Sequence, residues 1–231
     1  MRCYLFTSSC SFAAILVAFL SHGNLVAGNE ASNNVVDVTV YYESLCRDSM
    51  QWIKEKLLPS YDQLKDYINI TFIPYGKALH TESPTTGEWQ FSCQHGPSEC
   101  EGNMAQACGI HAIQKEESAE KVQQLTVALV ACAMTSRYPP SSVPQCAKKV
   151  ELSKKAEDSI NKCIEGSLSK ELLVENGKRT AALNPPLSFV PTITINGVNS
   201  KEIQNQAFSD FPKLICDHLA EGAKPLLCSR A

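Results

Sequence analysis

The stretch at residues 35–49 reads VVDVTVYYESLCRDS and decides the fold. Its first half alternates β-branched or aromatic residues with Asp37, Thr39 and Tyr41, which is typical of a strand. From Cys46 onward the apolar residues recur at three- and four-residue steps, which predicts a helix. The apolar positions are Val36, Val38, Val40 and Tyr42 in the strand and Met50, Ile53 and Leu57 in the helix. The sequence therefore places a cysteine where a strand ends and a helix begins.

Cys46 is the candidate nucleophile. Unpaired backbone N–H groups at the start of a helix favour a thiolate over a thiol, and the thiolate is the reactive form. A dithiol enzyme of this design would carry its second cysteine three residues later, but Ser49 stands there. We therefore predict an attacking sulfur at Cys46, accompanied by the Ser49 hydroxyl and lacking a resolving thiol.

Length and composition are those of one ordinary globular domain. The chain has 231 residues, of which 44% are hydrophobic and 19% charged, and this excludes a wholly disordered protein. The formal net charge of -3 gives no electrostatic reason to expect nucleic acid or an anionic membrane as a partner.

The first 28 residues predict a secretory signal peptide. A positive start at Arg2 precedes the apolar run 12–20, and small residues at 26–28 offer a cleavage point. The alternative is an uncleaved anchor helix, but the apolar run is short for a hydrocarbon layer of about 30 Å. No later stretch is long and apolar enough to cross a bilayer. We expect one domain at 29–231, with a helical insertion at about 80–185.

The cysteine count predicts a disulfide framework with one thiol left over. Of eleven cysteines, Cys3 and Cys10 fall in the leader and nine remain. In the secretory pathway most of these should form bridges, and the odd number leaves Cys46 as the natural free thiol. Eight cysteines allow 105 pairings, among which the sequence does not choose. The disulfide candidates are Cys93, Cys100, Cys108, Cys132, Cys146, Cys163, Cys216 and Cys228.

Downstream of a stop at Pro59 and Ser60, residues 69–76 predict a second strand. The triplet Asn69-Ile70-Thr71 is also a glycosylation sequon, so Asn69 is a candidate glycosylation site; the alternative is that it is never modified. Residues 76–93 are polar and irregular, which predicts a loop. Helices are then expected over 99–115, 118–134 and 148–165, with a fourth, shorter one after Ser169.

The last part of the chain predicts a strand, a turn and a helix. A strand should begin within 189–195, the Asn196-Gly197 pair should make a tight turn, and 202–219 should form an amphipathic helix. Pro191 stands directly before the buried strand. It is either a cis proline that shapes a site or an ordinary trans proline at a strand start.

A second motif carries a resemblance to a known family. Cys93-Gln94-His95-Gly96, Glu99-Cys100, Asn103 and Cys108 match every fixed position of the signature of the gamma-interferon-inducible lysosomal thiol reductase family. The segments 41–46, 75–78 and 182–197 are also similar to this family, so the resemblance covers about 35–228. It implies an α/β protein with a thioredoxin-like fold and a large, disulfide-bonded helical insertion. It also implies that Val190 and Pro191 lie against the nucleophile and bind substrate.

Two positions depart from the family pattern. Family reductases carry a cysteine where this chain has Ser49, and many members have an aromatic residue where this chain has Thr192. In a dithiol reductase the second sulfur resolves the mixed disulfide that the first one forms. Here a small external thiol such as cysteine or glutathione would have to do so, and turnover should be slow or limited by that thiol.

His95 has two interpretations. The resemblance implies a structural loop held by disulfides from Cys93 and Cys100, and we expect no cofactor and no metal. The alternative is a zinc site formed by Cys93, His95, Cys100 and Cys108, which a secretory compartment disfavours. The remaining histidines with no catalytic pattern, predicted to be surface or partly buried, are His80, His111 and His218.

Two functions remain open from the sequence. The first is a lysosomal or secreted thiol-disulfide oxidoreductase that acts on protein disulfides through Cys46, with external thiol or as an isomerase. The second is a binding protein on the same scaffold, redox-inactive or weakly active, that captures partners non-covalently or as a mixed disulfide. Ser49 is the feature that keeps the second function open.

Overall fold

A three-stranded sheet organises the part of the chain that the computed structural model describes, residues 34–229. Its order is β2-β1-β5, with β1 at Val36–Tyr42, β2 at Ile68–Pro74 and β5 at Thr192–Ile195. The central strand β1 pairs in parallel with β2 and antiparallel with β5. Its alternate residues Val36, Val38, Val40 and Tyr42 are fully buried, as the sequence pattern predicts. The predicted leader at 1–28 lies outside the described residues.

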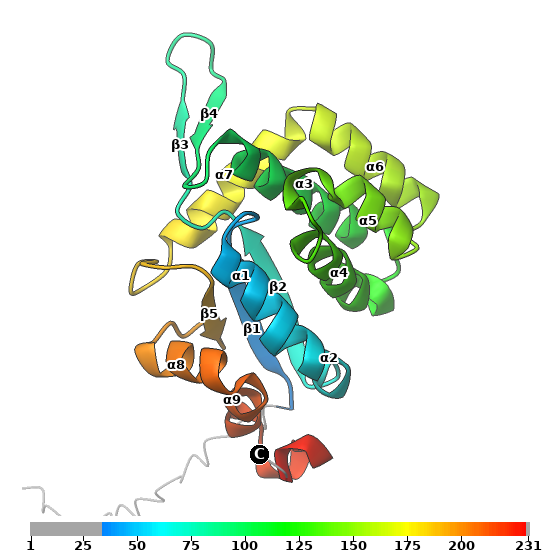
Figure 1. The fold of residues 1–231 in the computed structure, drawn as a ribbon, viewed down its shortest axis with the longest axis vertical. Coiled ribbons are helices and arrows are strands. Elements are labelled where there is room, and N and C mark those ends of the chain that lie inside the picture. Colours follow the sequence, from blue (N-terminus) through cyan, green and yellow to red (C-terminus); the bar gives the residue numbers. More distant parts are fainter. Residues whose placement is uncertain (1–33, 230–231) are drawn as a thin grey trace, which may run out of the picture. The chain divides into compact units, whose positions relative to one another are not determined.

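One continuous helical segment connects β1 to β2. It consists of α1 (Arg47–Trp52), a π-helical stretch (Ile53–Leu57) and α2 (Leu58–Leu64), and it covers one face of the sheet (Figure 1). The predicted stop at Pro59 is therefore wrong. Proline in a regular helix lacks an N–H and clashes with the carbonyl four residues earlier. Here a π-helical stretch ends at Leu57, two residues before Pro59, with Leu58 N–H bonded to Ile53 O, and its wider turn lets the helix continue.

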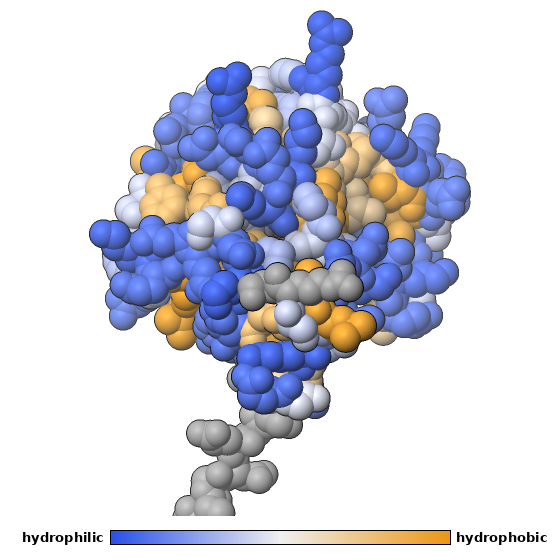
Figure 2. Space-filling view, turned by 60° about the horizontal axis from the view of Figure 1, so that its bottom comes forward, coloured by the Kyte–Doolittle hydropathy of each residue, from blue (hydrophilic) through white to orange (hydrophobic). Residues whose placement is uncertain are grey.

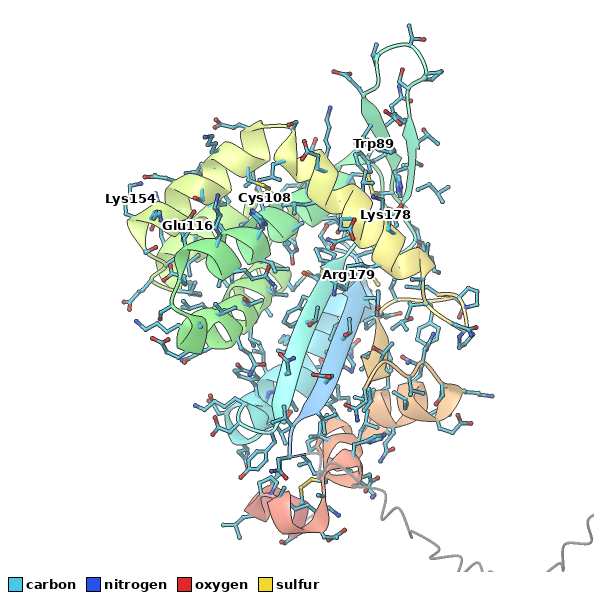
Figure 3. All side chains as sticks on the ribbon, turned by 180° about the vertical axis from the view of Figure 1, so that it is seen from behind. Trp89, Cys108, Glu116, Lys154, Lys178 and Arg179 are labelled. Carbon is cyan, nitrogen blue, oxygen red and sulfur yellow. A yellow bond between two sulfur atoms is a disulfide. The ribbon has the colours of Figure 1, made fainter. Side chains whose placement is uncertain are left out.

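A β-hairpin occupies the region that was predicted to be an irregular loop. Strands β3 (Leu79–Glu82) and β4 (Trp89–Ser92) pair antiparallel and stand apart from the three-stranded sheet (Figures 1 and 3). In β4 the partly buried Trp89 and Phe91 alternate with the exposed Gln90 and Ser92, but this pattern covers only four residues, and β3 is mostly exposed without it. The loop prediction for this region is therefore wrong.

A block of helices lies between β4 and β5. Its two longest members, α3 (Pro97–Glu116) and α4 (Ala119–Met134), fall where the sequence predicts helices. The predicted third helix is broken into α5 (Val143–Lys149) and α6 (Lys154–Glu165), because Glu151 adopts a left-handed conformation and Ser153 caps a new helix. The last helix, α7 (Leu168–Ala181), has 14 residues and is not the short helix expected. A short 3-10 turn, η2, spans Pro139–Ser141.

The C-terminal region closes the sheet at β5. Asn196 and Gly197 both have positive φ and form the predicted tight turn. The predicted last helix is two helices, α8 (Lys201–Ser209) and α9 (Phe211–His218). The break falls at Asp210, whose side chain accepts from Lys213 N and caps α9. Two 3-10 turns follow, η3 (Glu221–Ala223) and η4 (Leu226–Ser229).

Three hydrophobic clusters stabilise this arrangement, and the smallest consists of Tyr75, Ala78 and Leu173. The two larger ones have separate places in the fold. One joins the sheet to α1, α2, α4, α8 and α9, and the other fills the helical block between α3, α4, α5 and α6. On the face shown in Figure 2, hydrophilic residues predominate and hydrophobic ones form separate patches. Between residues 34 and 229, no helix combines the length and the apolar character that crossing a membrane would require.

Candidate active site

Cys46 lies at the junction of β1 and α1, where it is the N-cap residue of the helix. Its sulfur accepts a hydrogen bond from the backbone N–H of Ser49 at 3.5 Å, as an N-cap side chain does. This contact directs a backbone N–H of the first helical turn at the sulfur. The structure thus places the predicted nucleophile at the start of a helix.

The loop before β5 lies against the same sulfur. Val190 O is 3.7 Å from Cys46 Sγ, although 144 residues separate the two in the chain. The Val190–Pro191 peptide bond is cis, and β5 begins directly after it, so the missing N–H of Pro191 interrupts no ladder. Thr192, the residue that departs from the family pattern, donates its hydroxyl to Phe189 O at 2.7 Å and closes this loop.

Ser49 is fully buried beside Cys46, and its hydroxyl oxygen has no hydrogen-bond partner. The backbone of Ser49 contacts the sulfur, whereas no hydrogen bond joins the Ser49 hydroxyl to it. A hydroxyl does not replace a thiol in resolving a mixed disulfide, because it is a far poorer nucleophile.

Access to Cys46 is restricted. Only 7% of the residue is exposed, so Cys46 is part of the buried core. The sequence prediction requires a sulfur that is both free and reachable; the structure shows a free sulfur with little exposed surface. The exposed aromatic ring of Phe189 packs against Phe208 on α8 at a centroid distance of 6.3 Å, next to the Val190–Pro191 loop.

All eight disulfide candidates are paired in the structure. Within residues 34–229, Cys46 is the one cysteine outside a disulfide. The pairs are Cys93–Cys100, Cys108–Cys163, Cys132–Cys146 and Cys216–Cys228. Three of them lie in the helical insertion or at its start, and the fourth ties α9 to the C-terminal turn. The zinc alternative drawn from the sequence is therefore wrong, because its three cysteines carry no thiolate.

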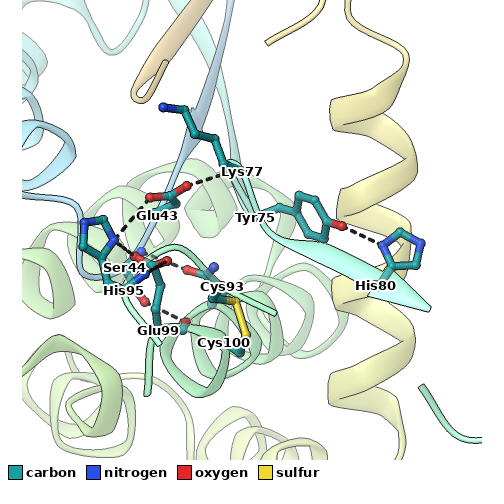
Figure 4. The surroundings of a disulfide bond; sticks show 10 residues. Glu43, Ser44, Tyr75, Lys77, His80, Cys93, His95, Glu99 and Cys100 are labelled. Carbon is teal, nitrogen blue, oxygen red and sulfur yellow. Dashed lines mark hydrogen bonds and ion pairs between the residues drawn. A yellow bond between two sulfur atoms is a disulfide. The ribbon is translucent and has the colours of Figure 1, made fainter. Parts of the chain in front are cut away.

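The signature motif packs against the loop that leads to Cys46 (Figure 4). Asn103 Oδ1 accepts from Ser44 N at 2.8 Å, and Ser44 Oγ donates to Glu99 O at 3.0 Å. Both Ser44 and Asn103 are fully buried. The motif thus fixes the backbone two residues before the nucleophile, which gives the spacing of the family signature a physical purpose in this chain.

His95 contacts two buried carboxylates that the sequence analysis did not connect with it. Its Nδ1 lies 2.5 Å from Glu99 Oε2 and 3.5 Å from Glu43 Oε2. Burial raises the pKa of the Glu43 carboxyl; the hydrogen bond from Lys77 N opposes the shift, and the nearby Glu99 charge adds to it. The sequence offered little reason to expect these contacts, because Glu43 follows the first strand and Glu99 lies in the signature motif, far from it in the chain.

The remaining predicted residues lie elsewhere. Asn69 is exposed on β2, where its amide nitrogen donates to Asp37 Oδ1 at 3.0 Å, and its glycosylation stays a prediction. His80 is hydrogen-bonded to the Tyr75 hydroxyl at 2.6 Å. His80, His111 and His218 are partly buried, as expected, and none of them belongs to the Cys46 segment or to the signature motif.

Together, the sheet order, the cysteine at the start of α1 and the cis proline before β5 define a thioredoxin-like protein with a helical insertion. A solved thiol-disulfide oxidoreductase, MdbA from Actinomyces oris, shares this fold with a TM-score of 0.54 at 12% identity, over 83% of each chain. The fold predicted from the sequence is confirmed.

Sequence comparison gives the family. The model of the gamma interferon inducible lysosomal thiol reductase family matches residues 37–150. The gamma-interferon-inducible lysosomal thiol reductase of Carassius auratus is 33% identical over 84% of this chain and 72% of its own length. GILT-like protein 1 of Drosophila melanogaster is 31% identical over 84% of this chain and 79% of its own length. The chain belongs to this family, as the signature motif predicts.

Proposed function

We propose that this protein is a thiol-disulfide oxidoreductase that reduces or rearranges disulfides in other proteins through Cys46. The observation that carries the proposal is the one free sulfur of residues 34–229, which lies at a helix start, 3.5 Å from Ser49 N and 3.7 Å from Val190 O. Family membership supports the reaction type, because the relatives are named thiol reductases.

The chemistry requires an external reductant. The Cys46 thiolate attacks a substrate disulfide, which forms a mixed disulfide and releases one substrate thiolate. A small thiol such as cysteine or glutathione then attacks Cys46 Sγ and releases the second substrate thiolate. Another molecule of the small thiol frees Cys46 and leaves as the small-molecule disulfide. Two small thiols are thus oxidised for each substrate disulfide reduced.

The Val190–Pro191 loop is proposed to bind the substrate beside the sulfur. Val190 O lies within reach of Cys46 Sγ, so a substrate sulfur bonded to Cys46 must lie close to this loop. We place the reaction in the secretory pathway, in the lysosome or outside the cell, after removal of residues 1–28. Disulfide-containing proteins are the proposed substrates, and the charge of -3 offers nothing that would attract nucleic acid.

Insulin reduction tests the proposal. We expect residues 29–231 to reduce insulin disulfides only when free cysteine is supplied, faster than the same cysteine concentration alone. The Cys46→Ser variant should give the rate of free cysteine alone. Assays at pH 5 and pH 7.5 compare an acidic with a neutral compartment.

Absence of turnover at either pH, with cysteine or glutathione, would refute the enzymatic proposal. The binding function would then be the better account, since Ser49 leaves the mixed disulfide without an internal resolving group. In that case a mixed disulfide at Cys46 should persist on non-reducing gels.

A further inference from the structure

Glu43, His95 and Glu99 form a cluster of metal-ligating atoms that the proposed redox reaction does not use. One ligand atom from each residue lies within 4.8 Å of the other two. Three separate segments contribute: the loop after β1, the loop before α3, and the first turn of α3 (Figure 4). His95 and Glu99 lie four residues apart in the signature motif, and folding brings Glu43 to them from a distant part of the sequence.

Backbone groups orient both carboxylates. Glu43 Oε1 accepts from Lys77 N at 2.7 Å, and Glu99 Oε1 accepts from His95 N at 3.1 Å. The second oxygen of each carboxylate then points toward His95 Nδ1. Fixing one oxygen while leaving the other free is how outer contacts orient the ligands of a metal ion.

One of the converging oxygens has no hydrogen-bond partner. Glu43 is fully buried, and its Oε2 forms no hydrogen bond although it lies 3.5 Å from the imidazole nitrogen. Leaving a buried carboxylate oxygen without a hydrogen bond costs free energy. His95 alone does not satisfy both carboxylates, since its Nδ1 is engaged by Glu99 at 2.5 Å. Glu43 Oε2 is therefore left without a hydrogen-bond donor at the point where the three atoms meet.

We propose that Glu43 Oε2, Glu99 Oε2 and His95 Nδ1 bind a divalent transition-metal ion of the Zn²⁺ type. Two ligands of a tetrahedral zinc ion stand about 3.3 Å apart, close to the Glu43–His95 spacing, and small side-chain shifts accommodate Glu99. An imidazole with two carboxylates suits zinc, whereas Ca²⁺ requires six to eight oxygen ligands. The His95 side chain is 39% exposed, which gives the ion access to solvent and to a water ligand.

The ion would hold the segment that leads to the nucleophile. Glu43 O accepts from Cys46 N at 3.3 Å, so a ligand at Glu43 is connected to the start of α1. A bound ion stabilises the folded state, by an amount that rises with the logarithm of its affinity, because the unfolded chain lacks the site. We therefore expect zinc to raise the melting temperature.

Calorimetric titration with ZnCl₂ at pH 7.5 tests this site. The protein is the Cys46→Ser variant of residues 29–231, which is first treated with EDTA and dialysed to remove bound metal. Replacing Cys46 removes the free thiolate as a competing ligand. We expect one saturable site per chain and a rise in melting temperature with ZnCl₂ but not with CaCl₂. Adding His95→Gln or Glu43→Gln should weaken binding by at least about tenfold. Glu43→Gln retains an oxygen for the Lys77 contact, and His95 is partly exposed, so both variants should keep the native circular dichroism spectrum.

His111→Gln is the matched control, since it removes another partly buried histidine outside the cluster. Binding by this variant should equal that of the parent. Absence of saturable binding in the Cys46→Ser protein would overturn the proposal. Equal binding after His95→Gln and Glu43→Gln would overturn it as well, because the ion would then occupy another part of the surface.

Discussion

At the scale of single residues, Ser49 limits the proposed function to the attacking half of a dithiol cycle. Its side chain is buried without a hydrogen-bond partner, so a thiol at the same position costs no polar contact. Ser49→Cys would place a resolving sulfur one helical turn from Cys46. Since intramolecular attack replaces a bimolecular step, we expect insulin reduction at limiting free cysteine to rise by at least about tenfold.

Ser49→Ala is the control for this substitution. It removes the same hydroxyl without supplying a nucleophile, so its rate should stay close to that of the parent protein. Mass spectrometry shows whether Ser49→Cys forms a disulfide between Cys46 and the introduced thiol. If that disulfide forms and the variant turns over no faster, then resolution is not the slow step. Limited access to Cys46 would then account for the rate.

Gly102 is a second residue on which the site depends. A Cβ atom there would lie 2.5 Å from Ser44 Oγ and 3.0 Å from Pro140 Cα, so α3 can approach the loop before Cys46 only with glycine. We expect Gly102→Ala to destabilise the fold by about 1–3 kcal/mol in chemical denaturation, despite the better helix propensity of alanine. Gly222→Ala, with nothing within 4 Å of its Cβ, should be close to neutral; a similar loss in both variants would contradict the packing argument.

At the scale of elements, the sequence predicted those features that depend on interactions between residues close together in the chain. The alternation in β1, the cap at Cys46 and the Asn196-Gly197 turn each depend on a few neighbouring residues, and all were predicted correctly. Helix breaks were missed because apolar periodicity continues across them. Asp210 ends one helix and caps the next without interrupting the apolar pattern.

The composition of the site was only partly predictable for a related reason. Cys46 and Pro191 stand at recognisable positions, a helix start and a strand start. The contact of His95 with Glu43 joins residues 52 positions apart, and it arises only when the signature loop folds onto the end of β1. No periodicity in the sequence encodes such a contact. In the β3–β4 hairpin the apolar face of β4 consists of Trp89 and Phe91, which pack against His80, and two residues are too short a pattern to predict a strand.

The two disulfides of α3 should differ in their contribution to stability. Cys108–Cys163 closes a loop with a sequence separation of 55 and joins α3 to α6, whereas Cys93–Cys100 has a separation of 7. Loop-closure entropy predicts a loss of about 4 kcal/mol for the first and about 2 kcal/mol for the second when each pair is replaced by alanine. Guanidinium unfolding of the two double alanine variants measures the difference in their free energies of unfolding. The comparison is matched because each variant loses two sulfur atoms. Equal losses would show that chain entropy does not govern these bridges.

At the scale of the whole molecule, pairing of the other described cysteines leaves Cys46 free, and the burial of Cys46 in turn protects those disulfides from exchange. The four bridges use every cysteine of residues 34–229 except Cys46, so no internal thiol is left to attack the nucleophile or its mixed disulfide. A free thiol in an oxidising compartment risks exchange with structural bridges. Burial of Cys46 to 7% exposure limits this exchange, at the cost of slower access for substrates.

Thiol counting tests this relation in the intact protein. We denature residues 29–231 without reductant and alkylate the protein with iodoacetamide, and we expect one adduct, at Cys46. After reduction of the disulfides we expect nine adducts. In the native state the reaction should be much slower than in the denatured state, because so little of Cys46 is exposed. Cys46→Ser should give no adduct before reduction. Two or more adducts would show an open bridge, and equal native and denatured rates would show that the fold does not shield the sulfur.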